Sequence, residues 1–285
     1  MASNPTRSPR SLNWLLVVVA VALVATISFA IERHHAAVET AAAATPPGPV
    51  PASVMASLTG ITAETWDHAG VAGAAEPVFV GATEPQGAKP VVLYIGAGFC
   101  PYCAAARWSI ITSLARFGTF SGLSYGASSA VDVYPSTPTF SFYGAGYFSE
   151  YVDFQSVELE GDVQMPNGQY QPLERPTPEQ EALIEKYDKP PYVAASGAGG
   201  IPFVLIGGRY MWSGSPFSPG LLANQTQADI AATLPAGTGD AAHAILINGN
   251  QVTAAICAVD GNQPAAVCNT PVIQAAIKGL PAKTP

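Results

Sequence analysis

The stretch 91–103, VVLYIGAGFCPYC, decides the fold of this chain, because an apolar run leads directly into a pair of cysteines. Val91–Ile95 is short, continuous and rich in β-branched residues, which predicts a fully buried strand. The residues after Cys103 follow a helical pattern. Two cysteines separated by two residues at a strand-to-helix turn indicate a redox pair.

Cys100 is the cysteine expected at the start of the helix. Unpaired backbone N–H groups and the positive end of the helix dipole favour a thiolate there, so we expect the pKa of Cys100 to lie below that of a free cysteine. Pro101 suits the first helical position, where its fixed φ is already helical and no N–H is needed. Cys103 lies one turn further along and can attack a mixed disulfide formed at Cys100.

The same spacing also occurs in zinc knuckles and in inert cysteine pairs, so both alternatives stay open. A structural zinc site with four cysteines usually combines two short spacings, whereas the other two cysteines, Cys257 and Cys268, are far apart in the chain. Of the four histidines, His34 and His35 flank the apolar run at 14–31, and His68 and His243 stand alone. These observations favour redox chemistry without a metal.

The composition limits both the size of the core and the class of partner. A chain of 285 residues with 48% hydrophobic side chains can bury one core, enlarged by an insertion. Only 11% of the residues are charged and the formal net charge is −8. Without a basic stripe to neutralise phosphates, the sequence argues against a nucleic-acid partner.

The N-terminal part of the chain predicts a membrane anchor. Residues 14–31 (WLLVVVAVALVATISFAI) form an uncharged, almost wholly apolar run, at the short end of what spans a bilayer. Arg7 and Arg10 precede this run, so the positive-inside tendency places residues 1–13 in the cytoplasm. We therefore expect a single-pass signal-anchor in the cell membrane, with everything after Ile31 extracytoplasmic, where disulfides persist.

A cleaved signal peptide is the alternative, because Ala41–Ala44 offers small residues to a peptidase. Charged residues and histidines at 32–35 separate these alanines from the apolar run, which is also longer than usual for a signal peptide. Residues 32–52 lack a periodic apolar face and are rich in Ala and Pro, which predicts a linker. Residues 53–285 are then the extracytoplasmic domain.

The remaining elements follow from periodicity and turn residues. The sequence predicts strands at 77–80 and 91–95, a helix at 104–117 that stops at Gly118, and a hairpin or two neighbouring strands at 139–143 and 147–159. Residues 161–171 are expected to form a polar loop. Thr177-Pro178-Glu179-Gln180 resembles a capping box that opens a helix through Tyr187.

The last third of the chain changes from strand to helix. Residues 201–212 predict two strands joined by a tight turn at Gly207-Gly208. From Thr226 onward the chain is Ala-rich and helical in character. We expect interruptions at Gly237, Gly239, Gly249, Gly261 and Pro264.

With its cysteine pair and Gly200-Ile201-Pro202 before a strand and a Gly turn, the chain resembles the thioredoxin superfamily, in particular its DsbA-like branch. This resemblance implies an α/β fold with a thioredoxin-like central mixed sheet, a helical insertion and an Ala-rich helical C-terminus, after one transmembrane helix. It also implies a cis bond at Pro202, with the backbone of Ile201 free to pair with an extended substrate. Thr137-Pro138 also precedes a strand and competes for this role.

Three further stretches resemble the membrane-anchored domain-of-unknown-function family 929, whose own function is poorly defined. They are Tyr94-Ile95-Gly96-Ala97, the CPYCAA run with Arg107-Trp108, and Arg116-Phe117-Gly118-Thr119-Phe120. The resemblance covers about residue 90 to the C-terminus, and it implies the fold more firmly than an activity.

The chain departs from the thioredoxin and DsbA pattern around the cysteines. Those proteins carry an acidic residue in the strand before the pair, and this strand has none. Members of the second family tend to have acidic residues near the pair, where this chain has Gly98 and Ala106. Less negative charge lowers the pKa of Cys100 and favours the reduced form, but it also removes a proton carrier.

Cys257 and Cys268 are expected to form a structural disulfide that ties a C-terminal helix to its following loop. An electron shuttle to Cys100 is the alternative for this pair. Nothing in the surrounding sequence indicates an activated thiol.

The sequence therefore predicts a membrane-tethered thiol–disulfide oxidoreductase that acts on secreted or envelope proteins and needs no cofactor. Cys100 would attack, Cys103 would resolve, Pro202 and Ile201 would hold the substrate, and Phe99 and Tyr102 would line an apolar docking rim. By resemblance, a membrane redox partner would recycle the pair. A non-catalytic binding or scaffold module in the cell envelope is the alternative.

Overall fold

The computed structural model describes residues 48–81 and 89–285. The predicted cytoplasmic segment, the predicted membrane span at 14–31 and most of the predicted linker lie outside these residues. Within the described residues, every helix is too short or too polar to cross a bilayer.

The centre of the fold is a mixed sheet of five strands in the order β1-β11-β10-β2-β7. Its strands are β1 (Val78–Phe79), β2 (Val91–Gly96), β7 (Asp153–Glu158), β10 (Phe203–Ile206) and β11 (Tyr210–Ser213). Strands β2 and β7 are parallel, whereas β10 is antiparallel to both β2 and β11, and β1 is antiparallel to β11. This arrangement confirms the expected mixed α/β class.

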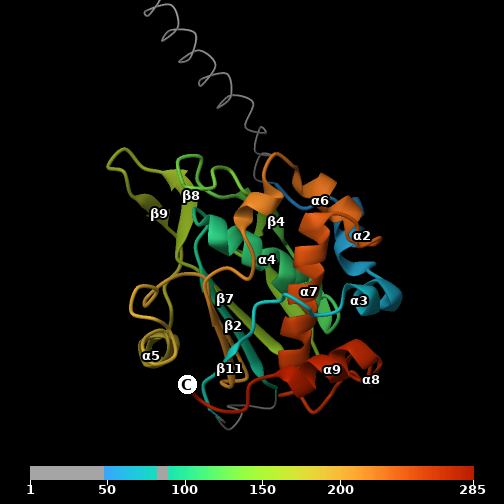
Figure 1. The fold of residues 1–285 in the computed structure, drawn as a ribbon. Helices are drawn as coiled ribbons and strands as arrows, with labels where there is room; N and C mark the ends of the chain where they lie inside the picture. Colours follow the sequence, from blue (N-terminus) through green and yellow to red (C-terminus); the bar gives the residue numbers. More distant parts are fainter. Residues whose placement is uncertain (1–47, 82–88) are drawn as a thin grey trace, which may run out of the picture. The chain divides into compact units, whose positions relative to one another are not determined.

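Both faces of the sheet are buried, which explains the continuous apolar run of β2. Successive side chains of a strand point to opposite faces, so Val92 and Tyr94 join one core cluster while Leu93 and Ile95 join another. Helices α4 (Pro101–Leu114) and α7 (Asp240–Cys257) contribute to the first cluster, and α5 (Pro178–Tyr187) contributes to the second. In Figure 1, α7 and α5 lie on opposite sides of the sheet.

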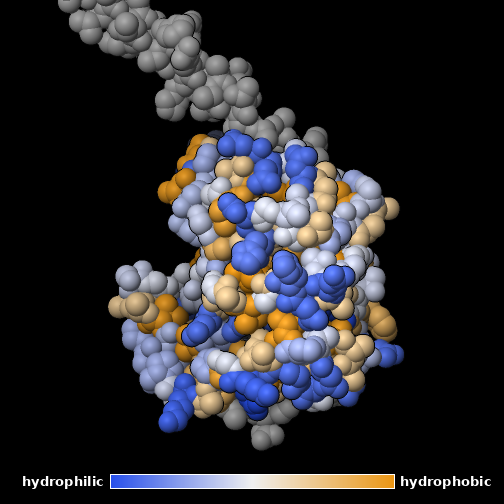
Figure 2. All heavy atoms as spheres, turned by 45° about the vertical axis from the view of Figure 1, so that its right-hand side comes forward, coloured by the Kyte–Doolittle hydropathy of each residue, from blue (hydrophilic) through white to orange (hydrophobic). Residues whose placement is uncertain are grey.

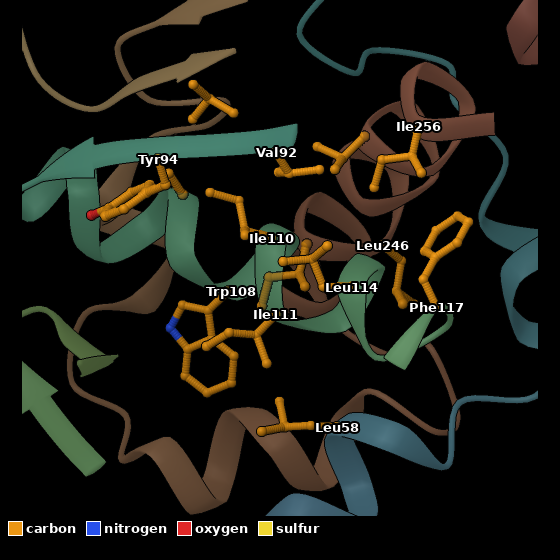
Figure 3. Close-up of a cluster of buried hydrophobic side chains, with 14 of the residues drawn as sticks. Leu58, Val92, Tyr94, Trp108, Ile110, Ile111, Leu114, Phe117, Leu246 and Ile256 are labelled. Carbon is orange, nitrogen blue, oxygen red and sulfur yellow. The ribbon is translucent and has the colours of Figure 1, made fainter. Parts of the chain in front are cut away.

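Helix α4 is enclosed on all sides, because all of its residues except Tyr102 are buried. Figure 3 shows Ile110, Ile111 and Leu114 of this helix among side chains from β2 and α7. The buried hydroxyl groups of α4 are hydrogen-bonded within the protein; for example, the Ser109 hydroxyl donates to the carbonyl of Ile245, 3.1 Å away. The helix that begins at the cysteine pair therefore lies at the centre of the hydrophobic core.

Shorter helices cover α4 and α7 from outside. They are α2 (Ala52–Thr59), α3 (Ala63–Ala69), the 3-10 helix η1 (Pro219–Leu222), α6 (Gln227–Thr233), α8 (Ala265–Cys268) and α9 (Pro271–Gly279). Hydrophilic and apolar residues are mixed over the face that Figure 2 shows.

Several predicted elements are confirmed. Strands β1 and β2 lie where the apolar runs predict them, and α5 begins with a capping box between Thr177 and Gln180 and ends at Tyr187. Strands β10 and β11 form a hairpin whose turn residues, Gly207 and Gly208, have φ values of 57° and 62°. Only a residue without a Cβ adopts such values readily.

The insertion between α4 and β10 differs from the expectation, because it consists mainly of strands. Besides β7 and α5 it contains β3 (Gly118–Ser121), β4 (Ser124–Ala127), β5 (Pro138–Ser141), β6 (Gly146–Ser149), β8 (Glu160–Gln164) and β9 (Tyr170–Pro172). These strands pair as β3–β6, β4–β5 and β8–β9. Strands do form within 139–143 and 147–159, but the hairpin alternative is wrong, because each of these strands pairs with a strand elsewhere. The expected polar loop at 161–171 belongs to the β8–β9 hairpin.

Two glycines also differ from their predicted roles. Gly118 begins β3 and does not adopt the left-handed cap of a helix. Gly249 lies inside α7 and does not interrupt it. A Cβ on Gly249 would lie 3.0 Å from the ring of Trp66, so the missing side chain lets α3 pack closely on α7.

The folded part of the chain begins earlier than the predicted boundary at residue 53. The carbonyl of Gly48 accepts a bond from Tyr125 N–H at 2.9 Å, and Val50 N–H donates to Leu123 at 3.1 Å. The last residues of the predicted linker therefore pair with the β4 region.

Candidate redox site

Cys100 is the N-cap residue of α4, directly after the loop that follows β2. Its φ and ψ are −77° and 120°, and its Sγ accepts the backbone N–H of Cys103 at 3.2 Å. Pro101 occupies the first turn, as its fixed φ allows. The sulfur thus occupies the place that a serine or aspartate oxygen takes at other helix starts.

The pair faces a proline loop from a distant part of the chain. Cys100 Sγ lies 3.8 Å from the carbonyl oxygen of Ile201, and the Ile201–Pro202 peptide bond is cis. The competing Thr137–Pro138 bond is not among the cis bonds of the described residues. The fold therefore brings together Cys100, Ile201 and Pro202, as expected from the sequence.

The two cysteines differ in exposure and in acidity. Cys100 is 4% exposed and Cys103 is completely buried, and neither is part of a disulfide. The pKa of Cys100 is lowered, chiefly because the side chain of Cys103 donates a hydrogen bond to it, with smaller contributions from backbone N–H groups and from Arg107. Burial, followed by that same hydrogen bond, raises the pKa of Cys103 well above its usual value.

A groove of about 740 Å³ opens beside the pair. Tyr102, which is 40% exposed, lines it together with Ile201, Gly200 and Tyr134. The rings of Tyr102 and Tyr134 meet edge to face, with centroids 6.0 Å apart. The groove therefore presents the rings of two tyrosines close to the backbone of the proline loop.

Phe99 does not line this groove. Its ring stacks on Tyr170 of β9, with centroids 4.4 Å apart, and its carbonyl accepts the N–H of Ser129 at 2.8 Å. The Tyr170 hydroxyl in turn donates a hydrogen bond to Ser129 Oγ at 2.6 Å. Phe99 thus fixes the loop before Cys100 to the β8–β9 hairpin.

A buried ion pair close to the cysteines was not predicted from the sequence. Arg107, one turn after Cys103, donates from Nε and Nη2 to the carboxylate of Glu158 at 2.9 and 2.6 Å. Nη2 also donates to the carbonyl of Ala97 at 2.8 Å. Both side chains are 1% exposed. The available signal was a lone charged residue in an otherwise uncharged helix, but its partner is 51 residues away.

Glu158 places an acidic side chain near the cysteine pair, where the sequence predicts little negative charge. The strand before the pair has no acid, but the neighbouring strand β7 brings one. Its carboxylate accepts the N–H of Phe142 at 3.3 Å in addition to the arginine. Backbone atoms of Gly161 occupy the space that a side chain on Gly98 would need, 2.9 Å from its ideal Cβ.

Cys257 and Cys268 are joined by a disulfide across 11 residues, with Cα atoms 5.5 Å apart. Asp260 lies close to these sulfurs, and burial raises its pKa to about 6. Among the described residues these three offer one grouping of possible metal ligands. Because both sulfurs are bonded to each other, neither is a thiolate that could hold a metal.

The fold and the site together define a class: a mixed α/β protein that carries a buried cysteine pair at the start of its central helix. The family model described as "Domain of unknown function (DUF929)" matches residues 83–258, and the chain belongs to this family. The matched region includes both site cysteines, the proline loop and the ion pair, and it ends just after α7. No curated protein and no solved structure matches the chain.

Proposed function

We propose that this protein is a thiol–disulfide oxidoreductase with a thioredoxin-like fold of the DsbA-like branch. The observation that carries the proposal is the position of Cys100 Sγ, which caps α4 and accepts the N–H of Cys103 at 3.2 Å. The lowered pKa of Cys100 supports the same role, because the thiolate is the reactive species in exchange. The proline loop beside it supports the thioredoxin-like assignment.

In the proposed reaction, the thiolate of Cys100 attacks a sulfur of a substrate disulfide. A mixed disulfide forms, and the second substrate sulfur leaves as a thiolate. Cys103 then attacks Cys100 Sγ, which yields the Cys100–Cys103 disulfide and releases the remaining substrate thiol. The substrate is reduced by two electrons and the pair is oxidised by two, and the reverse sequence oxidises a substrate dithiol.

The proposed substrates are extended segments of other proteins. The groove beside the pair contains Tyr102 and the backbone of Ile201, which suits a chain that pairs with main-chain atoms and packs apolar side chains. Exposed Tyr102 supplies the apolar contact, whereas Phe99 acts indirectly by holding the loop.

The proposed location is the outer face of a cell membrane. The apolar run at 14–31, with arginines before it, supports a signal-anchor that leaves the cysteine pair extracytoplasmic. The disulfide between Cys257 and Cys268 suits an oxidising compartment. A membrane protein that exchanges electrons with Cys100 is the proposed recycling partner.

The test is a trapping experiment on the full chain. The Cys103→Ser variant, in which resolution is blocked, should accumulate mixed disulfides with substrate proteins through Cys100, visible as bands that a reducing agent removes. The Cys100→Ser variant is the matched control and should trap none. Absence of trapped species, together with no insulin reduction and no oxidative refolding by the wild-type protein, would favour the non-catalytic binding module.

A further inference from the structure

Two buried hydrogen-bond donors near the pair have no partner among the described residues. They are the Tyr94 hydroxyl and Nη1 of Arg107. Tyr94 is completely buried and Arg107 is 1% exposed. An unpaired buried donor costs on the order of 1–3 kcal/mol, so such groups call for an explanation in the function of the protein.

Tyr94 and Arg107 both lie near Cys103. A Cβ placed on Gly96 would overlap the Tyr94 oxygen and would lie 3.1 Å from Cys103 Sγ, so the hydroxyl and the sulfur border the same small space. Arg107 follows Cys103 by one helical turn, and its guanidinium carbon lies 5.6 Å from the centre of the Tyr94 ring. In Figure 3, Tyr94 lies between β2 and α4.

Glu158 fixes the direction in which Arg107 points. The carboxylate accepts from Nε and Nη2, and Ala97 accepts from Nη2 as well, so three bonds hold the guanidinium in one orientation. Nη1 is the nitrogen that remains without a partner in the described residues. The ion pair therefore fixes a charged, oriented group beneath the cysteines.

The resolving step of the proposed reaction requires a charge on Cys103. In the resting protein burial opposes that charge and raises the pKa of the thiol, and Arg107 lowers it. The ionisable groups that interact around Cys103 and Tyr94 are Cys100, Arg107 and Glu158. Once Cys100 is bound to a substrate sulfur, its own charge no longer competes with a charge on Cys103.

We propose that the Tyr94 hydroxyl, in the field of Arg107, donates a hydrogen bond to the Cys103 thiolate that forms during exchange. This inference rests on the proposed function and deepens it. The hydroxyl is a pre-positioned donor for a transient negative charge, as in sites that stabilise an oxyanion. Gly96 is required because any side chain there would fill the space that the hydroxyl and the sulfur share.

The chemical step is balanced. Cys103 gives up its proton, its thiolate attacks Cys100 Sγ of the mixed disulfide, and the substrate sulfur departs as a thiolate that takes up a proton. One disulfide forms and one breaks, so no further oxidant or reductant is needed. In the opposite direction Cys103 is the leaving group, and the same hydrogen bond stabilises it as it departs.

The test is Tyr94→Phe in the full chain, which removes only the hydroxyl. The Cys100–glutathione mixed disulfide is prepared, and its resolution by Cys103 is followed as release of glutathione. We expect Tyr94→Phe to slow this release by about 10- to 100-fold, which is the effect of losing a hydrogen bond to a charged group. When Cys100→Ser is also present, Tyr94→Phe should move the midpoint of the pH dependence of Cys103 alkylation to higher pH.

The matched control is Tyr147→Phe. Tyr147 donates to the carbonyl of Leu114 at the far end of α4, 2.9 Å away, so this change also removes one tyrosine hydroxyl. We expect it to leave glutathione release unchanged. Equal slowing in both variants, or an unchanged pH profile of Cys103 in Tyr94→Phe, would overturn the inference.

Failure of the inference and failure of the proposed function give different results. If wild-type Cys100 forms no mixed disulfide, the proposed function fails. If Cys100 forms one and Tyr94→Phe resolves it at the wild-type rate, only the role of Tyr94 is wrong. Because the hydroxyl has no partner in the described residues, Tyr94→Phe should keep its melting temperature, which separates a catalytic effect from unfolding.

Discussion

At the scale of single residues, the two cysteines show how one hydrogen bond can separate the acidity of two identical groups. Cys103 donates to Cys100, which favours the thiolate of Cys100 and the neutral thiol of Cys103. The peptide N–H groups at the helix start act in the same direction on Cys100. In the proposed exchange, this difference would distinguish the attacking thiol from the resolving thiol before any substrate binds.

The pH dependence of alkylation tests this distinction. Since the pKa of Cys100 is lowered, its reaction with iodoacetamide should reach half its maximal rate at a pH below about 8.5, the value of a free cysteine. The sign follows because only the thiolate reacts, and a lower pKa leaves more of it at any given pH below that value.

The Cys103→Ala variant is the control for this measurement. It removes the side-chain donor and keeps the backbone N–H of residue 103, so the midpoint for Cys100 should move to higher pH. A midpoint that stays in place would show that the helix start alone sets the acidity of Cys100.

At the scale of elements, α7 shows how packing reverses a local preference. Gly→Ala inside a helix usually stabilises a protein by up to about 1 kcal/mol. At Gly249 the new Cβ would meet the buried ring of Trp66 at 3.0 Å. We expect Gly249→Ala to destabilise the fold by about 1–3 kcal/mol, measured by denaturant unfolding.

Gly279→Ala is the matched comparison at the exposed end of α9. A Cβ on Gly279 has no neighbour within 4 Å, so this change should be neutral or stabilising by at most about 1 kcal/mol. If both variants gained stability equally, the close contact between α3 and α7 would not exist in solution.

Elements with a local sequence signal could be predicted, whereas features set by contacts between distant segments could not. Strand β2, helix α5 and the β10–β11 hairpin carry local signals: an apolar run, a capping box and two adjacent glycines. The pairings β3–β6 and β4–β5 carry none, because alternation predicts a strand but does not name its partner. The sequence predicts a helix break at Gly249, because the ring of Trp66 that requires this glycine comes from a distant segment.

The candidate site likewise combines residues that were predictable from the sequence with residues that were not. The cysteine pair and the proline before a hairpin are motifs of adjacent residues and were predictable as candidates. The ion pair of Arg107 and Glu158 joins residues 51 positions apart, and the proposed role of Tyr94 depends on the space left by Gly96. Only the folded arrangement brings these groups together beneath Cys103.

At the scale of the whole molecule, the disulfide and the redox pair belong to different parts of the structure. The Cys257–Cys268 bond ties the end of α7 to α8. Replacing both cysteines with alanine should lower the free energy of unfolding by about 2–4 kcal/mol. Because we expect no electron transfer through this bond, the turnover of insulin reduction by the folded double variant should equal that of the wild type. A slower turnover with an unchanged alkylation rate would support the shuttle alternative.

The enclosure of α4 has a consequence for the choice of substrates. A helix packed on every side except at its first turn cannot lean out toward a partner, so Cys100 has to be approached by sulfur that comes to it. Folded proteins bury most of their disulfides, and a cysteine that is held rigidly at the start of a packed helix cannot reach them. If the proposed exchange takes place here, the expected substrates are newly exported chains that have not yet folded. Such a chain would stop being a substrate once folding buries its cysteines.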